Sequence, residues 1–65
     1  TDVAALLADL PRQQRLSMAL FYVDNLSIAE VAATLGLSDG AVKFHLHQGR
    51  DRLRGLFAVQ QDAQP

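Results

Sequence analysis

The two histidines, His45 and His47, are the side chains of this chain with the clearest capacity for metal binding or proton transfer. They are two residues apart in a segment that we expect to be helical, so they point about 200° away from each other. The sequence contains no cysteine, and no carboxylate cluster accompanies the histidines, so a zinc-binding pattern is absent. No serine has a partnered base, and no glycine-rich loop has a nucleotide-binding spacing. We therefore expect no metal, no cofactor and no enzymatic activity.

A second chemical feature is a basic flank on the same segment. Lys43, His47, Arg50 and Arg54 fall along one side of a helix. Four of the six lysine and arginine residues lie in the segment from Lys43 to Arg54. Contacts to DNA phosphates need such a local patch, even though the whole chain has a formal net charge of −1. The alternative is an ordinary solvated face of an amphipathic helix.

These side chains need a helical scaffold, and the sequence predicts one along most of its length. No segment shows the sustained alternation of apolar and polar residues that is typical of a half-buried strand. A first short helix should end near Leu10, because a proline disfavours α-helical geometry in the residue before it. Pro11 suits the first turn of a second helix, which we expect to run to about Val23. The next two residues, Asp24 and Asn25, are typical of a turn.

Two further helices are predicted on either side of a short turn. Ser27 and Glu30 form a capping box that begins the third helix. Gly36 ends that helix, because glycine readily adopts the left-handed conformation found at helix C-termini. Ser38 caps the fourth helix. Two helices joined by a short turn with glycine are a helix-turn-helix, here at about residues 28–57, and in that motif the second helix enters the DNA major groove.

Length and composition fit one small domain. A chain of 65 residues buries a modest core. No apolar run is long enough to span a membrane, no secretory signal segment is visible, and the lack of cysteine suits a reducing compartment. We expect a cytoplasmic location, and we expect a monomer because no heptad pattern extends past Phe57. The domain should cover residues 1–58, and residues 59–65 should form a frayed tail or a linker.

The second predicted helix is apolar over more than one face. In so small a domain, not all of its apolar side chains can be buried. One interpretation is a wide stripe that packs in the core. The other is a partner-binding surface, since exposed apolar patches mark interaction sites. The residues of that surface would be Leu6, Leu7, Leu10, Met18, Phe21 and Tyr22.

Two segments of the chain resemble a known family. They are LPRQQR at residues 10–15 and LSIAEVAATLGLSDGAVKFHLHQGRDRLR at residues 26–54. They are similar to region 4 of bacterial RNA polymerase sigma factors, especially the extracytoplasmic-function (ECF) group, whose usual pattern is LPxxxR, a helix, and LSxxEVAxxLGxSxGTVKSRLxRAxxxLR. The resemblance covers residues 6–57 without gaps. LuxR-type regulators are the nearest alternative and share the AEVA and VKxH elements. Their usual LTxRE start and KLG-type end are absent here.

The resemblance implies a fold and a function. Region 4 is a small all-α, four-helix domain with a helix-turn-helix, similar to a winged helix without the wing. In the family, the last helix recognises the promoter −35 element, and earlier helices bind the flap of the polymerase β subunit or an anti-sigma factor. The partner-binding set above would form that second surface. The DNA-binding residues, carried over by position and joined by the arginines of the basic flank, would be Ser38, Asp39, Gly40, Ala41, Lys43, Phe44, His47, Gln48, Arg50 and Arg54.

Several positions depart from the family pattern. Ala41 replaces the usual threonine, and Phe44, His45 and Gln48 stand where a small residue and two arginines are usual. These changes remove charge or polar contacts, so a third alternative is a helical protein-interaction module with weak DNA affinity. If the helix does contact bases, Gln48 suits adenine and Phe44 suits a thymine methyl group, so the preferred sequence would differ from that of relatives.

Overall fold

The computed structural model of the chain describes the backbone of residues 3–62 and the side chains of residues 5 and 7–55. Within that range the secondary structure is helical and contains no strand. The all-α class predicted from the sequence is therefore confirmed. In chain order, the elements are α1 (Val3–Ala8), α2 (Arg12–Met18), the π-helix η1 (Ala19–Val23), α3 (Ile28–Leu35) and α4 (Asp39–Asp62).

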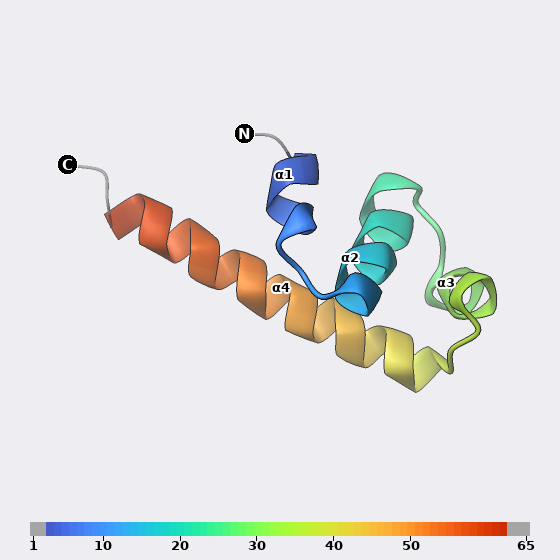
Figure 1. The fold of residues 1–65 in the computed structure, drawn as a ribbon. Helices are drawn as coiled ribbons and strands as arrows, with labels where there is room; N and C mark the ends of the chain where they lie inside the picture. Colours follow the sequence, from blue (N-terminus) through green and yellow to red (C-terminus); the bar gives the residue numbers. More distant parts are fainter. Residues whose placement is uncertain (1–2, 63–65) are drawn as a thin grey trace.

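The shorter helices gather beside the long helix α4 (Figure 1). Both α2 and α3 pack against α4, and α1 packs against α2. The C-terminal part of α4 projects away from the other helices, and the molecule is elongated, with extents of 44 × 19 × 17 Å. The helix-turn-helix of α3 and α4 forms the opposite end. None of the described helices is both long enough and apolar enough to cross a membrane.

The second predicted helix differs from expectation at both of its ends. Pro11 lies before the helix as its N-cap, and its carbonyl accepts a hydrogen bond from the Arg15 N–H at 2.9 Å. The final turn is π-helical, because the Asp24 N–H donates to the Ala19 carbonyl at 3.1 Å. The single helix predicted over residues 11–23 is thus α2 followed by η1. Hydrophobic spacing over one turn cannot distinguish a π turn from an α turn.

The third helix begins and ends at the predicted residues. The hydroxyl of Ser27 accepts from the Glu30 N–H at 3.1 Å, and the Glu30 carboxylate accepts from the Ser27 N–H at 3.0 Å, which completes the capping box. Gly36 has a φ of 69°, in the left-handed region. Asn25, in the preceding turn, has a φ of 58°, which asparagine tolerates better than most residues.

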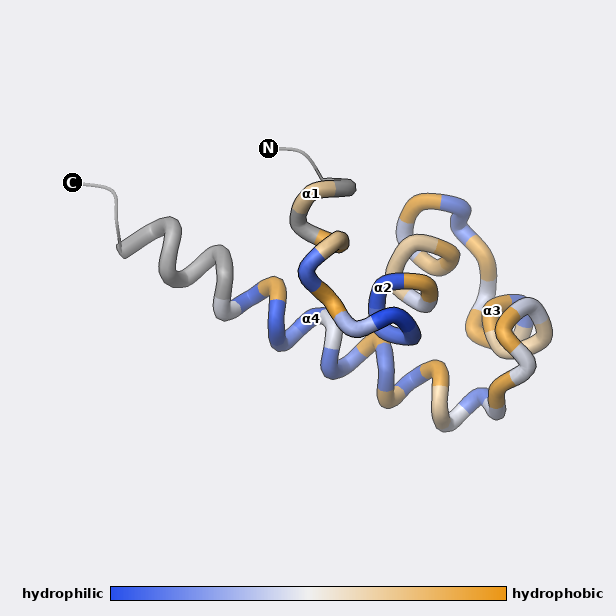
Figure 2. Tube along the Cα trace, viewed as in Figure 1, coloured by the Kyte–Doolittle hydropathy of each residue, from blue (hydrophilic) through white to orange (hydrophobic). Residues whose placement is uncertain are grey.

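The core is formed where α2 and α3 pack against α4 and α1 packs against α2. Val31 and Val42 are fully buried, and Leu46 is almost so. Hydrophobic residues dominate α3 and η1, whereas on α4 they alternate with polar ones, as expected for a helix with one buried face (Figure 2). The remaining apolar side chains of the core are Leu7, Leu10, Met18 and Ala32.

The packing of α4 on α2 depends on a residue without a side chain. A Cβ atom at Gly49 would lie 2.9 Å from Met18 Cγ and 3.1 Å from its Sδ, closer than ordinary contacts allow. Gly49 is buried, so the missing side chain lets the two helices approach each other. From the sequence alone, this glycine is only a weak helix former.

The fourth helix continues to Asp62, past its predicted end at about residue 57. The helical backbone of residues 59–62 therefore differs from the predicted frayed tail. The segment loses its apolar periodicity in the sequence, but alanine and glutamine have a high helix propensity. Residues 63–65 lie outside the described part of the chain.

Replacing Gly49 by alanine tests the close approach of α2 and α4. Overpacking against Met18 costs about 1–3 kcal/mol, and the better helix propensity of alanine returns about 1 kcal/mol. We expect Gly49→Ala to lower the free energy of unfolding by about 1 kcal/mol, which is a fall in Tm of about 4–8 °C. Gly55→Ala is the matched control on the same helix, because nothing lies within 4 Å of a Cβ atom there. It should raise the Tm, and an equal rise for Gly49→Ala would contradict this packing.

The capping box gives a pH dependence that can be measured. The Ser27 backbone N–H, and then the Ser27 hydroxyl, lower the pKa of Glu30 below its ordinary value of 4.5. A lowered pKa in the folded state stabilises the fold above the unfolded pKa, and this stabilisation is lost as the pH falls through the folded value. Glu30→Gln keeps an oxygen acceptor without the charge. We expect the Tm of the wild type to fall more than that of the variant between about pH 7 and about pH 3. Parallel curves of Tm against pH for the two proteins would contradict a stabilising charge on Glu30.

Candidate nucleic-acid interface

The turn between α3 and α4 fixes where the long helix starts. The Leu37 N–H donates to the Ala32 carbonyl at 2.9 Å, which closes the end of α3. The Ser38 hydroxyl accepts from the Ala41 N–H at 3.1 Å, which begins α4 and confirms the predicted cap. The side chain of Leu37 packs against the core between these two hydrogen bonds. The polar caps and the apolar anchor together hold α4 at a defined angle to α3.

The side of α4 opposite Val42 and Leu46 is its outer face. Lys43, Phe44 and His47 are exposed on this helix, and Phe44 is 57% exposed although it is a large apolar side chain. An exposed phenylalanine here has no role in the core. Other DNA-binding residues were predicted in this half of α4 and at its cap. Of these, Ser38, Asp39 and Gly40 are exposed, and Ala41 and Gln48 are half-buried.

The two histidines occupy different environments. His45 is half-buried, its Nδ1 has no hydrogen-bond partner, and its ring lies edge-on to Phe44 with centroids 5.7 Å apart. His47 is exposed. No three potential metal-binding side chains come together in the described part of the chain. His45 therefore helps to support the exposed phenylalanine ring, and His47 is available at the surface.

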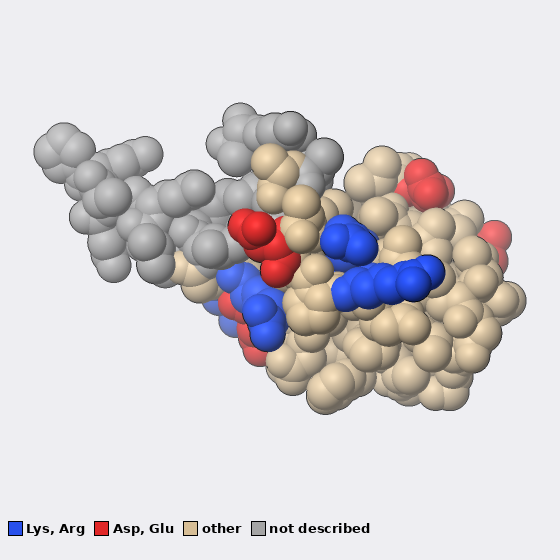
Figure 3. Space-filling model, viewed as in Figure 1, with Lys and Arg blue, Asp and Glu red and all other residues tan. Residues whose placement is uncertain are grey.

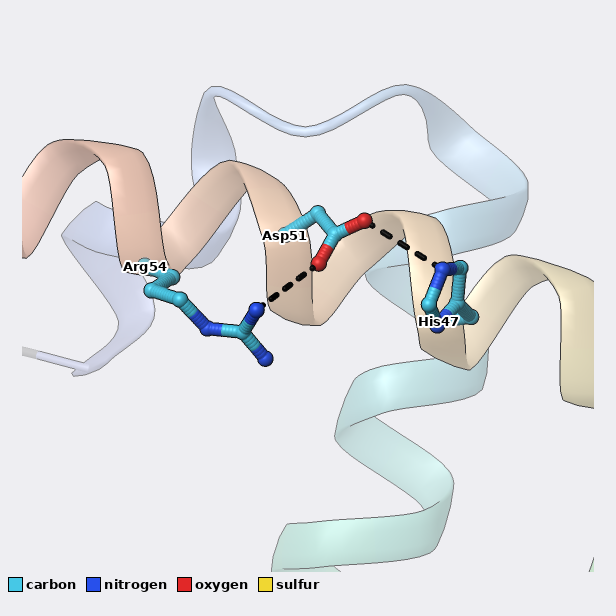
Figure 4. Close-up of polar contacts among 3 residues, drawn as sticks. All are labelled: His47, Asp51 and Arg54. Atoms are coloured by element: carbon cyan, nitrogen blue, oxygen red, sulfur yellow. Dashed lines mark ion pairs between the residues drawn. The ribbon is translucent and has the colours of Figure 1, made fainter.

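Several members of the basic flank contact neighbouring groups. Arg50 Nη1 donates to the Tyr22 hydroxyl at 2.9 Å, which links α4 to η1. Arg54 Nη1 lies 3.3 Å from Asp51 Oδ1, and His47 Nε2 lies 3.3 Å from Asp51 Oδ2 (Figure 4). Lys43 has no ion pair with the carboxylates of the described residues. The structure thus brings the predicted basic residues to α4, but it pairs two of them with one aspartate.

Positive charge is unevenly spread over one face of the molecule. On the face shown in Figure 3, lysine and arginine side chains gather over the start of α2 and over α4, and none appears at the end of the molecule around α3. The chain as a whole carries a net charge of −1. Phosphate contacts dominate the affinity of DNA-binding proteins, so a chain with only six lysine and arginine residues is expected to bind DNA weakly on its own.

The structure divides the predicted partner-binding set. Leu7, Leu10 and Met18 belong to the core, with 8%, 4% and 4% of their surface exposed, so they cannot offer a surface to a partner in this conformation. The wide apolar stripe of the second helix is partly buried because α1 and α4 both cover it. The side chain of Leu6 lies outside the described residues.

The exposed apolar residues of the second helix lie at its C-terminal end. Tyr22 and Val23 are 48% and 60% exposed. Phe21 is half-buried, and its ring meets the Tyr22 ring edge-on with centroids 4.9 Å apart. We call Phe21, Tyr22 and Val23 the η1 patch. Two of its members were predicted, and Val23 was not, because its apolar side chain alone gave no sign of exposure.

Asp51 is the other residue that the sequence analysis did not assign. Its spacing from His47 and Arg54, at i−4 and i+3, is the spacing of side-chain pairs on a helix and would have indicated these contacts.

A helix-turn-helix whose second helix exposes its outer face is the architecture of a DNA-binding domain. The chain matches the family described as "Sigma-70, region 4" over residues 1–53. It is 39% identical over 57 residues to the ECF RNA polymerase sigma factor SigE of Mycolicibacterium smegmatis, a match that covers 88% of this chain and 22% of that protein. It is 40% identical over 45 residues to the ECF RNA polymerase sigma factor SigW of Bacillus subtilis, covering 69% of this chain and 24% of that protein. This chain therefore belongs to the sigma-70 region 4 family, and both of these relatives are ECF sigma factors.

Family membership confirms the resemblance inferred from the sequence and favours it over the LuxR-type alternative. At the level of the family, sigma factors are DNA-binding proteins of promoter recognition in transcription initiation. The chain spans less than a quarter of the length of the two relatives.

Proposed function

We propose that this chain recognises the −35 element of promoters through the outer face of α4 and docks on the β-flap of RNA polymerase through the η1 patch. The observation that carries the proposal is the exposed N-terminal half of α4 in a sigma region 4 domain. The chain itself catalyses nothing in this scheme. It positions the polymerase at a promoter, a role that belongs to the cytoplasm.

Phosphate binding is supported by the start of α4. The first N–H groups of a helix have no partners within the helix and favour an anion. Ser38 occupies one of them, since its hydroxyl accepts from the Ala41 N–H. The N–H groups of Asp39 and Gly40 are then available to a phosphate, and Lys43 is exposed one turn further on. The carboxylate of Asp39 opposes this attraction and limits its strength.

Base contacts are supported by three side chains of different chemistry. A lysine such as Lys43 donates to guanine O6 and N7, and a glutamine such as Gln48 pairs with adenine through two hydrogen bonds. Phe44 offers an apolar surface to a thymine methyl group. Lys43, Phe44 and Gln48 lie within two turns of the same helix, so they suit a short element of a few base pairs.

Polymerase docking is supported by the η1 patch. Tyr22 and Val23 are large, exposed and adjacent, and such patches mark protein interfaces. Docking would also compensate for the weak charge of the domain, because a tethered domain binds DNA at a high effective concentration.

An alternative function is a protein-interaction module whose DNA affinity is too weak to matter, with an anti-sigma factor as its partner. The observation in its favour is that the exposed aromatic residues, Tyr22 and Phe44, lie on different elements. Phe44 would then form part of a protein contact and not of a base contact.

Titration of the isotope-labelled chain with DNA tests the proposed function. The probe is a duplex with a GGAAC-type −35 element, and the control is a scrambled duplex at equal low salt. We expect NMR shifts concentrated at residues 38–48 and larger for the promoter duplex, because base contacts add to phosphate contacts only there. Small shifts that are equal for both duplexes would move the assignment to the protein-interaction module.

Polymerase docking is tested separately with the isolated β-flap. We expect Tyr22→Ala to weaken flap binding by about 1–2 kcal/mol, in the range typical of truncated interface residues. Lys43→Ala is the matched control, since it should weaken DNA binding and leave flap binding unchanged. Equal flap binding by the wild type and Tyr22→Ala would contradict docking through the η1 patch.

A further inference from the structure

Asp51 lies between the side chains of His47 and Arg54 on the exposed side of α4 (Figure 4). Its two carboxylate oxygens face different partners: Oδ2 is 3.3 Å from His47 Nε2, and Oδ1 is 3.3 Å from Arg54 Nη1. All three side chains are exposed, with 45% for Asp51, 66% for His47 and 76% for Arg54. Exposed ion pairs contribute little to folding, so this arrangement is not explained by stability.

The position of Asp51 on the helix relates it to the proposed base contacts. Asp51 follows Phe44 by seven residues, a rotation that returns to within about 20° of the same face, at about 10 Å further along the axis. The major groove is about 12 Å wide. If Phe44 faces the base edges, Asp51 lies near the edge of the groove, where the phosphates are. A carboxylate at that place repels them.

We infer that Asp51 limits the affinity of the chain for DNA by competing with phosphates for Arg54 and His47. The inference rests on the proposed DNA binding by the outer face of α4. In the free chain, one carboxylate holds Arg54 and also contacts His47, which is a cation when protonated. On DNA, the same carboxylate stays beside the backbone as a negative charge. Sequence-independent attraction is thereby reduced, and binding depends more on the base contacts of residues 38–48.

The chain offers a control with the same change in net charge. Asp24 is exposed and follows η1, and no cation of the described residues pairs with it. Asp51→Asn and Asp24→Asn each remove one negative charge and preserve the shape of the side chain. Only Asp51→Asn releases Arg54 and His47. The two variants therefore separate a local effect on α4 from the effect of overall charge.

The experiment compares the wild type, Asp51→Asn, Asp24→Asn and the double variant Asp51→Asn/Arg54→Gln. Binding to the fluorescent promoter duplex and to a scrambled duplex is measured over a range of about 50–200 mM salt. We expect Asp51→Asn to bind both duplexes about three- to tenfold more tightly at low salt, with a log–log salt slope steeper by about 0.9, the value for one additional phosphate contact. Asp24→Asn should bind within about twofold of the wild type, because Asp24 lies on another element and none of the described cations pairs with it. Adding Arg54→Gln should remove most of the gain.

The outcomes distinguish this inference from the proposed function. Unchanged or weaker binding by Asp51→Asn, an equal gain for Asp24→Asn, or no binding by any variant at low salt would each overturn the inference. A steeper salt slope and tighter binding for Asp51→Asn alone would support it, whichever duplex is preferred. The proposed −35 recognition is judged independently, by whether the wild type prefers the promoter duplex. Equal melting temperatures of the variants would show that the differences do not arise from unfolding.

Discussion

The contact between α2 and α4 at Gly49 and Met18 determines which side of α4 faces solvent. With Val42 and Leu46 buried and Gly49 pressed against Met18, α4 cannot rotate without opening the core. Because this side of α4 is buried, the opposite side, with Phe44 at its centre, must face solvent. The turn at residues 36–38 determines where α4 begins, because Gly36 is left-handed and Ser38 caps the helix. A small core and one short turn thus orient the whole proposed DNA-binding surface.

The charges on α4 limit its attraction to DNA phosphates. Few cations are available at the surface of α4, because Arg50 donates to Tyr22 and Arg54 contacts Asp51. A domain of this kind gains little from phosphates and relies on base contacts and on a tether to a larger assembly. The hydrogen bond between Arg50 and Tyr22 also connects the η1 patch to α4. The two proposed surfaces therefore lie on elements that contact each other directly.

Sequence reasoning predicted the features that depend on local backbone chemistry. The capping box at Ser27 and Glu30, the left-handed Gly36 and the cap at Ser38 are determined by a few neighbouring residues, and all are present. Features that depend on packing between elements were not predictable in this way. Burial of Leu7 and Leu10 requires knowing how α1 rests on α2, and the role of Gly49 requires knowing what faces it.

The same distinction between local and packing-dependent features applies to the candidate site. Exposure of Ser38, Lys43 and Phe44 at the start of α4 follows from helical periodicity, whereas Ala41 and Gln48 of the same predicted set are half-buried. Their state of pairing does not follow from periodicity alone. Arg50 has a partner 28 residues away, which no local pattern indicates, whereas the pairs of Asp51 lie within one turn and were predictable from their spacing.

Directed DNA cleavage shows whether the outer face of α4 lies against promoter DNA. The chain has no cysteine, so a single introduced one can carry a cleaving reagent. Gly40→Cys is suited to this, because nothing lies within 4 Å of a Cβ atom at Gly40, and Asp24→Cys is the control away from α4. We expect the reagent at position 40 to cut within or beside the −35 element, and the reagent at position 24 to leave it uncut. Absence of cleavage from position 40, or the same cleavage from both positions, would contradict it.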